Sequence, residues 1–457
     1  MDCATTSYPV GNLSSMSRLK QGFENMRFSN FKRIIHNNSK IFWLFYATGF
    51  FGVFLMNSAL TSILLYRYDP GPNVDQLPVL VPTFIAGSAF FAGRVIGAIF
   101  QPIAGYLSDS TQGKWGKRRP YLVISTPAIV GSFVLLLNPL ITETSRGNSL
   151  YLVSFLCLFY FALALYQVPY LAWLSELASQ DHQRVILSSW IGISSLIGAV
   201  IGGVGTPWLT AQYGFAVMTT VIGIISLVML LLPLLAPELV AQKTERLPLL
   251  SVLKASWQNP SFRSYVLGTS AAWSAMAILA VCPPFFAIAL LQQDVSYGAL
   301  LNALVLGGSA FSILILRPIV SRLGKKRTSQ FSMLWSGGGL VLLTVASVCL
   351  EPSLALWLAL LPISSLGLGS IIILPNAMMQ DVIDQDLKYG QSAQAIYYGS
   401  RGLFRELSTG FGILIAGSLL SLGNTASEPL GVQLSLVAAG LCVFVSAWFW
   451  MLYPISK

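Results

Sequence analysis

Charged residues are scarce in this 457-residue chain, because Asp, Glu, Lys and Arg together make up only 10% of it while 54% is hydrophobic. Mean hydropathy is +0.69. A soluble domain usually carries about 25% charged residues, so this chain could not cover its surface with polar groups in water. The shortage excludes a soluble enzyme or a secreted scaffold and predicts a protein that crosses a membrane many times.

Histidine and cysteine are also few. The two histidines, His36 and His182, fall in segments expected outside the membrane, which excludes a buried histidine proton relay. The five cysteines are odd in number and lie mostly within apolar runs, so they indicate neither a disulfide framework nor a metal cluster. The sequence also lacks nucleotide-binding loops, zinc-hydrolase motifs and nucleophile elbows. We therefore expect no catalytic residues, no metal and no cofactor.

Long apolar runs are plentiful and predict the fold class. A bilayer-spanning helix takes about 20 residues, so the chain has room for about twelve with short loops. The runs predict twelve spans at about 41–66, 82–107, 121–140, 150–173, 185–208, 214–236, 264–291, 297–319, 329–350, 353–378, 394–420 and 431–453. The predicted fold is an all-α membrane protein with two six-helix, pseudo-symmetric bundles.

The domain boundaries follow from the polar segments between the runs. The longest internal polar stretch, 238–260, divides the chain near its middle. The first 40 residues lack the apolar core of a signal peptide, so we expect the first span to be retained. The predicted parts are a cytoplasmic tail at 1–40, bundles at 41–236 and 263–453, a central cytoplasmic loop at 237–262 and a cytoplasmic C-terminus at 454–457.

The net charge of +10 is a topology signal. Most of the 27 Lys and Arg residues fall in the N-terminal tail and in alternate loops, such as 114–119 and 322–327. Cytoplasmic loops carry this excess of basic residues. The pattern predicts that both termini are cytoplasmic, with the plasma (inner) membrane as the expected location, and it removes the reason to expect nucleic-acid binding.

The two halves carry traces of an internal repeat. Gln101-Pro102-Ile103 ends the second predicted span and precedes KWGKRR, while Arg317-Pro318-Ile319 ends the eighth and precedes GKKR. Pro169 and Pro375 occupy matching places in the fourth and tenth spans. Internal repeats in a protein of this kind are typical of transporters that rock two bundles around a central site.

Three stretches resemble a known family. They are Arg94 to Tyr121 (RVIGAIFQPIAGYLSDSTQGKWGKRRPY), Val168 to Val185 (VPYLAWLSELASQDHQRV) and Leu374 to Gly399 (LPNAMMQDVIDQDLKYGQSAQAIYYG). Each resembles a motif of the glycoside-pentoside-hexuronide transporters, a branch of the major facilitator superfamily that includes the melibiose permease and its sucrose-transporter and lysolipid-transporter relatives. The resemblance implies the major facilitator fold and alternating-access transport.

The sequence departs from this family at its cation site. Cation-coupled members carry acidic residues where this chain has Phe54, Gly97, Gln101 and Gln167. Sodium needs several oxygen ligands with net negative charge, so the comparison implies that sodium coupling is lost. The same positions contribute to sugar recognition in the melibiose permease, which leaves the solute open. The family's lysine on the eleventh helix aligns with Glu406, which reverses the charge.

Charged residues at membrane depth are the main candidates for a functional site, because each costs about 2.5–3.5 kcal/mol to insert. Glu406 is the one carboxylate predicted well inside a span, next to Arg405 and near Arg401. We expect Arg405 and Glu406 to border a central cavity and bind polar groups of the solute, with Glu406 as the candidate for proton coupling. The alternative is structural pairing between helices. Further candidates for binding are Tyr46, Asn57, Arg94, Gln101, Gln167, Tyr170, Trp190, Asn376, Tyr397 and Arg401.

A second set of charges predicts a cytoplasmic gate. Asp109, Lys117 and Arg118 lie in or beside the loop between the second and third spans, and we expect them to form ion pairs when the cytoplasmic side closes. Solvated charges that only set topology are the alternative. The corresponding charges in the other loops are Glu176, Arg184, Asp381 and Asp384, of which Asp381 is expected to meet Lys325 or Arg327.

These observations predict a secondary-active or facilitative transporter of a small polar or amphipathic organic solute. Sugars or glycosides rank first and lysolipids second, with uniport or proton coupling in place of sodium coupling. A non-transporting receptor or assembly factor with the same fold is a further alternative. The expected partners are the solute and membrane lipids, and the expected state is a monomer.

Overall fold

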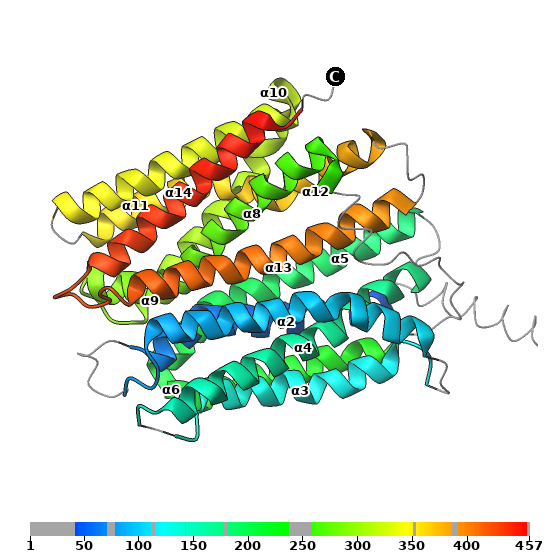
Figure 1. Ribbon diagram of the computed structural model, residues 1–457, viewed down its shortest axis with the longest axis horizontal. Coiled ribbons are helices and arrows are strands. Elements are labelled where there is room, and N and C mark those ends of the chain that lie inside the picture. Colours follow the sequence, from blue (N-terminus) through cyan, green and yellow to red (C-terminus); the bar gives the residue numbers. More distant parts are fainter. Residues whose placement is uncertain are drawn as a thin grey trace, which may run out of the picture.

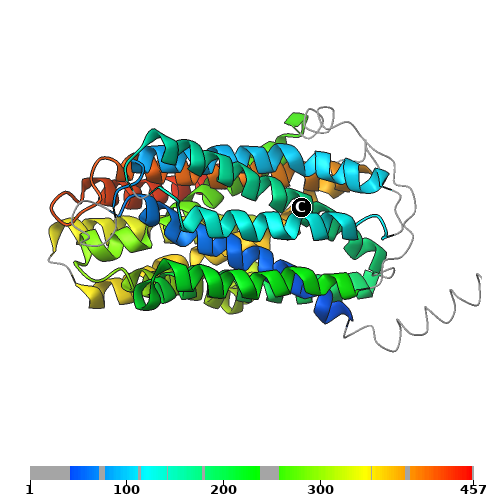
Figure 2. The ribbon, with the colours of Figure 1, turned by 90° about the horizontal axis from the view of Figure 1, so that it is seen from below.

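The computed structural model describes residues 42–70, 78–111, 115–141, 143–177, 181–236, 257–350, 353–385 and 392–454. Helices make up most of these ranges, which contain no strand, and they run side by side along one direction (Figure 2). The N-terminal tail 1–40 and most of the central loop 237–262 lie outside the described residues.

Two groups of helices divide the molecule, one from each half of the sequence (Figure 1). The N-terminal half contains the helix Phe42–Tyr68, α2 (Thr83–Ser110), α3 (Arg119–Leu137), α4 (Arg146–Leu177), α5 (Asp181–Val200), η1 (Ile201–Gly205), α6 (Thr206–Leu231) and η2 (Leu232–Leu235). The C-terminal half contains α8 (Pro260–Val281), α9 (Pro283–Phe285), η3 (Phe286–Leu290), α10 (Tyr297–Cys349), α11 (Leu354–Ser365), η4 (Gly367–Gly369), α12 (Ser370–Gln385), α13 (Ser392–Leu420) and α14 (Leu430–Leu452).

Among the described residues, 11 helices are long and apolar enough to cross a membrane. One of them, Ile186–Leu235, has 50 residues. At 1.5 Å per residue it would be about 75 Å long, far more than the roughly 30 Å of a bilayer core. It divides at Gly214, whose φ of +78° ends one helical run and starts the next. Counting this segment as two spans gives the twelve that the sequence predicts, and the all-α membrane fold is confirmed.

Two spans are less regular than their sequences indicate. The seventh, expected over 264–291, breaks after Val281 at Pro283 and Pro284 and continues as the π-helical turn η3. The tenth, expected over 353–378, tightens into the short η4 turn between α11 and α12. A Cβ at Gly367 would collide with the carbonyl oxygen of Ser332 on α10, so close helix packing accounts for this break.

The internal repeat has a structural counterpart. Gly116 and Gly324 stand directly before the repeated basic clusters and have φ of +92° and +77°, a left-handed conformation that glycine adopts readily. At the matching prolines, Tyr46 donates a hydrogen bond to the carbonyl of Tyr170, next to Pro169, and Tyr265 donates to the carbonyl of Pro375 over 3.0 Å. The first helix of each bundle is thus tied to the fourth in the same way.

The two bundles meet along α2 and α13, which lie side by side in opposite directions (Figure 1). Near the α9 end, Gly87 and Gly417 allow the backbones to touch, because a Cβ on Gly417 would lie 2.9 Å from the Cα of Gly87. At the same end the ring of Tyr66 packs edge-on against Phe285, with centroids 6.3 Å apart. A second contact joins η1 to α10. Small residues therefore set the spacing between the bundles.

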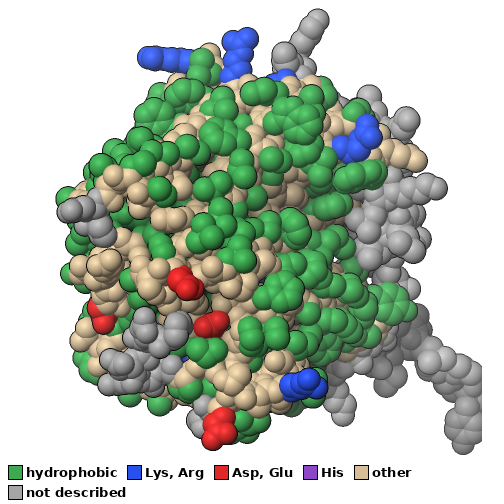
Figure 3. Space-filling view, turned by 60° about the vertical axis from the view of Figure 1, so that its left-hand side comes forward, with side chains coloured by type: hydrophobic (Ala, Val, Ile, Leu, Met, Phe, Trp, Pro, Cys, Tyr) green, Lys and Arg blue, Asp and Glu red, His purple; other side chains and the backbone are tan. Residues whose placement is uncertain are grey.

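Acidic loop residues gather at one end of the bundle, beside Arg67 and Arg146, and the basic clusters gather at the other. The loops at the α9 end contain Asp69, Glu143, Asp294 and Glu428, and Figure 3 shows acidic side chains on this end while apolar side chains cover the flank. The basic clusters 117–119 and 325–327 lie at the other end. This separation agrees with the predicted orientation, which itself remains a prediction.

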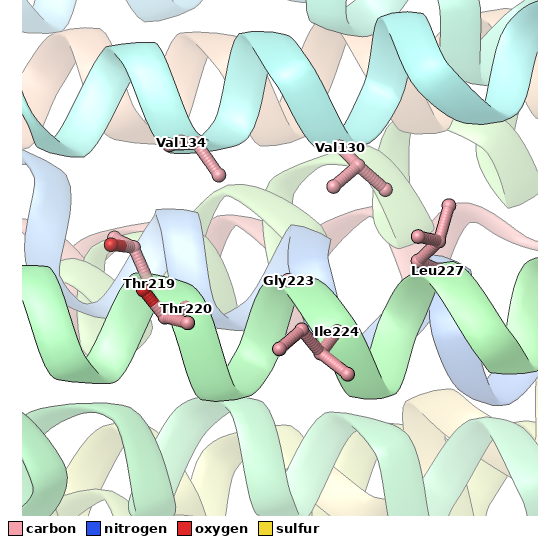
Figure 4. A pocket seen from close by; sticks show the side chains of 7 residues that line it. All are labelled: Val130, Val134, Thr219, Thr220, Gly223, Ile224 and Leu227. Atoms are coloured by element: carbon pink, nitrogen blue, oxygen red, sulfur yellow. The ribbon is translucent and has the colours of Figure 1, made fainter.

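An apolar groove lies on the outside of the N-terminal bundle between α3 and α6 (Figure 4). Its lining residues are Val130, Val134, Thr219, Thr220, Gly223, Ile224 and Leu227. Ile224 is 58% exposed and belongs to a membrane-spanning segment, so the groove faces the acyl chains of the bilayer. It has no charged lining residue and does not resemble a site for a polar solute.

Replacing Gly417 with alanine tests the glycine contact between the bundles. The added methyl group would lie 2.8 Å from the carbonyl oxygen of Thr83 and 2.9 Å from the Cα of Gly87, so we expect overpacking to destabilise the protein by about 1–3 kcal/mol. Thermal unfolding of the purified protein measures this. Gly131→Ala is the matched control, because nothing lies within 4 Å of its added Cβ. Equal midpoints for the two variants would contradict the close contact.

Candidate functional site

A buried ion pair connects the two bundles. Arg94 on α2 donates a hydrogen bond from Nη1 to Oε2 of Glu406 on α13 over 2.7 Å. The arginine side chain is 5% exposed and that of the glutamate 20% exposed. A charge pair at this depth gains strength from the low local dielectric but must offset the loss of hydration. Both residues are predicted from the sequence to bind the solute, and in the structure they pair with each other.

Two polar groups from the N-terminal bundle hold Arg94 in place. Its Nη2 donates to Oδ1 of Asn57 over 3.1 Å, and the hydroxyl of Tyr160 donates to the same oxygen over 3.3 Å. The guanidinium carbon lies 4.5 Å from the centroid of the Tyr160 ring. The arginine is therefore fixed by α4 and by the helix Phe42–Tyr68, while its partner belongs to the other bundle.

Helix α13 presents two different stripes. Gly402, Glu406 and Gly410 face α2: a Cβ on Gly402 would lie 3.5 Å from Oε1 of Gln101, and one on Gly410 would lie 2.9 Å from Cβ of Arg94. Arg405, Ser408 and Gly412 face α8. Residues at spacings of three and four share a helix face, so adjacent Arg405 and Glu406 point to different neighbours.

Arg405 stays within the C-terminal bundle. Its guanidinium carbon lies over the ring of Trp273 on α8, 4.3 Å from the centroid. The arginine is partly exposed. Arg405 and Glu406 are expected from the sequence to bind the solute together. In this structure they have different partners, since Glu406 pairs with Arg94 on α2 and Arg405 packs against Trp273 of its own bundle.

The remaining binding candidates are spread over different surroundings. Tyr46 and Tyr170 are fully buried, and their rings stack with centroids 4.3 Å apart. Each also donates its hydroxyl to the main-chain carbonyl of the other. They hold two helices of the N-terminal bundle together and present no surface to a solute in this structure.

The other candidates are at least partly exposed or are not described. Gln101 and Gln167 are partly exposed, and Trp190 on α5 is 44% exposed. The side chains of Asn376 and Tyr397 lie outside the described part of the structure. Arg401, one turn before Arg405, is partly exposed.

One of the expected gate pairs is present. Nζ of Lys325, directly after Gly324, lies 2.6 and 2.8 Å from the two carboxylate oxygens of Asp381 on α12. The prediction that Asp381 meets Lys325 or Arg327 is confirmed for Lys325. Burial and the nearby Asp381 carboxylate raise the pKa of Tyr453, just after α14. Its hydroxyl therefore stays protonated and donates to the carbonyl of Met378 over 3.3 Å.

The residues expected to form a matching gate in the N-terminal bundle are described only in part. Arg118 is buried and donates from Nη1 to Oγ of Ser108 over 2.7 Å, which ties the loop back to the end of α2. Lys117 is partly exposed. The side chains of the other expected gate residues lie outside the described part of the structure, namely Asp109, Glu176, Arg184 and Asp384.

Close packing explains why the position of Gly97 is not acidic. A Cβ at this residue would lie 3.2 Å from Cβ of Tyr160 and 3.4 Å from its carbonyl oxygen. A Cβ added at Gly93, one turn earlier, would lie 2.8 Å from Cδ2 of the Tyr160 ring. A carboxylate at residue 97 would therefore need α2 and α4 to move apart. Tyr160 thus packs against Gly97, one of the positions at which the resembled family carries an acidic residue.

Sequence reasoning missed two residues of this cluster, Tyr160 and Trp273. Both are aromatic residues in apolar runs, where aromatics are common, so composition alone does not distinguish them. The available signal was indirect: a buried arginine needs a ring or a carboxylate beside it, and the sequence offers three arginines at membrane depth for one glutamate.

The sequence matches a known family over most of its length. The profile of the family described as "MFS/sugar transport protein" matches residues 45–457. The chain belongs to this family of the major facilitator superfamily. The protein is thus a multi-pass membrane transporter and not an enzyme, as the sequence predicts.

Its relatives are distant but match over most of their length. "Uncharacterized symporter YjmB" of Bacillus subtilis is 25% identical, with 81% of this chain and 85% of the relative covered. "Glucuronide carrier protein homolog" of Escherichia coli is 24% identical, with 81% and 84% covered. "Sodium-dependent lysophosphatidylcholine symporter 1" of Mus musculus is 24% identical, with 91% and 85% covered.

A solved structure supports the fold. The crystal structure of the nucleoside transporter NupG superposes with a TM-score of 0.64 at 17% identity, covering 91% of this chain and all of that chain. At this identity the likeness shows the major facilitator fold alone.

A double-mutant cycle measures the link between the bundles. We expect Arg94→Gln and Glu406→Gln each to destabilise the protein, because each leaves a buried charge without its partner. The double variant should lose less than the sum, with a coupling energy of about 1–3 kcal/mol. Thermal unfolding of the four purified proteins measures it.

The pair Lys325 and Asp381 is the matched control, since its side chains are 38% and 21% exposed. Its own cycle, with Lys325→Gln and Asp381→Asn, should give a coupling of about 0.2–1 kcal/mol. Additive effects at Arg94 and Glu406 would show that the buried pair does not contribute as described.

Proposed function

We propose that this protein moves a small polar organic solute across the membrane by alternating access, with sugars or glycosides as the first solute class. The observation that carries the proposal is the buried pair of Arg94 and Glu406, which joins the two bundles at membrane depth. Bundles that rock against each other need contacts that can separate and form again, and an ion pair between rigid helices has this property.

The solute class is supported by relatives. One is named as a glucuronide carrier homolog, and another, from Lactiplantibacillus pentosus, as an isoprimeverose transporter. Lysolipids are the second candidate, because a relative named as a lysophosphatidylcholine symporter matches 91% of this chain. The polar side chains near the pair, Asn57 and Gln101, can hydrogen-bond to sugar hydroxyl groups.

Sodium coupling does not fit the described residues. A side chain at Gly97 would press on Tyr160, and the guanidinium of Arg94 over the Tyr160 ring already brings a positive charge to this region. Proton coupling has one candidate among the described carboxylates at membrane depth, Glu406. Arg94 competes with a proton for this carboxylate, so protonation requires that the two bundles separate there.

Transport assays in proteoliposomes test the function. We expect uptake of at least one member of a panel of neutral glycosides, sugar acids and lysolipids, with no stimulation by an inward sodium gradient. Glu406→Gln should abolish any accumulation driven by a proton gradient while downhill exchange continues. Uphill transport by this variant would refute coupling through Glu406, and a protein that transports no member of the panel would favour a receptor or assembly role.

A reversible cross-link tests alternating access separately. Gln101→Cys with Gly402→Cys places two thiols across α2 and α13, where a Cβ on Gly402 would lie 3.5 Å from the glutamine side chain. In a background whose five native cysteines are replaced by serine and which still transports, oxidation should abolish transport and reduction should restore it. Full transport by the oxidised, cross-linked protein would contradict relative motion of these helices.

A further inference from the structure

Arg405 lies at membrane depth and yet is accessible from outside the protein. It lies within the membrane-spanning segment Ser400–Leu420 and is partly exposed. Within the described part of the structure its side chain forms no hydrogen bond, and the guanidinium contacts the ring of Trp273. Most arginines at membrane depth pair with a carboxylate or a backbone carbonyl. The guanidinium donors of Arg405 are thus available to a molecule that reaches them.

Among the described side chains that act electrostatically on Arg405, positive charges outnumber negative ones. Arg405 lies within electrostatic range of Glu406, Arg401 and Arg94. The one carboxylate of this group already accepts a hydrogen bond from Arg94 over 2.7 Å. Two guanidinium groups therefore share one carboxylate at this depth, with Arg401 one turn away at the end of the span. The excess positive charge, in a region of low dielectric, attracts an anion far more strongly than it would in water.

The geometry suits an oxyanion. The Trp273 ring takes up one face of the guanidinium and limits its rotation. The N–H groups at the guanidinium edge form a planar fork that matches the two oxygens of a carboxylate or a phosphate. Because Arg405 is anchored within the C-terminal bundle while Glu406 reaches α2, an anion could bind to Arg405 without breaking the pair between the bundles.

We propose that Arg405, held by Trp273, binds an oxyanion group of the transported solute, so that the preferred solutes are organic anions rather than neutral sugars. The proposal rests on the transport function proposed above and narrows its solute class. Two kinds of solute carry such a group: sugar acids carry a carboxylate, and sugar phosphates or lysophospholipids carry a phosphate. Trp273 is a positioning residue in this arrangement.

Ligand binding to the purified full-length protein tests this with matched pairs. Methyl glucuronide is compared with methyl glucoside, glucose 6-phosphate with glucose, and lysophosphatidate with monoacylglycerol. Each pair differs in the anionic group. We expect the anion of at least one pair to bind at least tenfold more tightly than its neutral partner, measured by thermal shift and by calorimetry, and the pair that responds identifies the source of the oxyanion.

Substitutions assign the preference to Arg405. Arg405→Gln should remove the preference, because hydrogen bonds to a charged group are the stronger ones, while Arg405→Lys should keep part of it because the charge remains. Trp273→Leu should weaken the preference and Trp273→Phe should restore most of it. Arg322→Gln is the control, since it removes a positive charge from an exposed position on a different helix, α10.

Each outcome decides the question. Equal affinity for the anionic and neutral members of every pair, or an unchanged preference in Arg405→Gln, would overturn the proposal. If the wild-type protein transports neutral glycosides but binds no anion selectively, the transport function stands and the oxyanion site does not. The unfolding midpoint of each variant without ligand shows whether the variant is folded. If Arg405→Gln does not fold, the affinities of Arg405→Lys for the anionic and neutral ligands test the role of Arg405.

Discussion

The structure depends on a contact between opposite charges in a place where charges are rare. Arg94 and Glu406 meet at the boundary between two bundles, and small or apolar side chains such as Gly87, Gly417 and Tyr66 make other contacts described there. Apolar contacts are nearly indifferent to whether lipid or another helix covers them. A buried ion pair does depend on its surroundings, because a buried charge that loses its partner strongly destabilises the protein. The pair therefore distinguishes the joined arrangement of the bundles from every other arrangement.

Helix α13 links this contact to the rest of the site. One stripe faces α2 and contributes Glu406, while the next stripe faces α8 and contributes Arg405. Neighbouring residues on a helix are about 100° apart, so two consecutive side chains serve two bundles. A solute group that approaches Arg405 and a movement that separates Arg94 from Glu406 both act on this one helix, which offers a direct physical route from binding to movement.

Much of the fold could be predicted from the sequence, because the signals are strong where the physics is simple. Apolar runs predict the spans, and the repeated basic clusters after Gly116 and Gly324 predict two related halves. The pairing of Asp381 with Lys325 also follows, since both lie at loop ends that the repeat brings together.

The partner of Glu406 could not be predicted from the sequence. Helices α2 and α13 are some 300 residues apart, and which of their faces meet depends on glycines whose packing no local pattern reveals. Tyr46 and Tyr170 show a second limit: their hydroxyl groups suggest solute binding, but in this structure each hydroxyl donates to the main-chain carbonyl of the other residue, a pairing that no local pattern predicts.

The tyrosine contacts at Pro169 and Pro375 have a mechanical consequence. Because the first and fourth helices of each bundle are tied together, each bundle behaves as one stiff body. Where Gly87 meets Gly417 the backbones of the two bundles touch, and this contact can act as the fulcrum of a lever. Over a membrane core of about 30 Å, a rotation of about 10° at that fulcrum displaces the opposite ends by about 5 Å. A rotation of about 10° where two glycines fit together is then enough to separate the opposite ends by about the width of a small organic molecule.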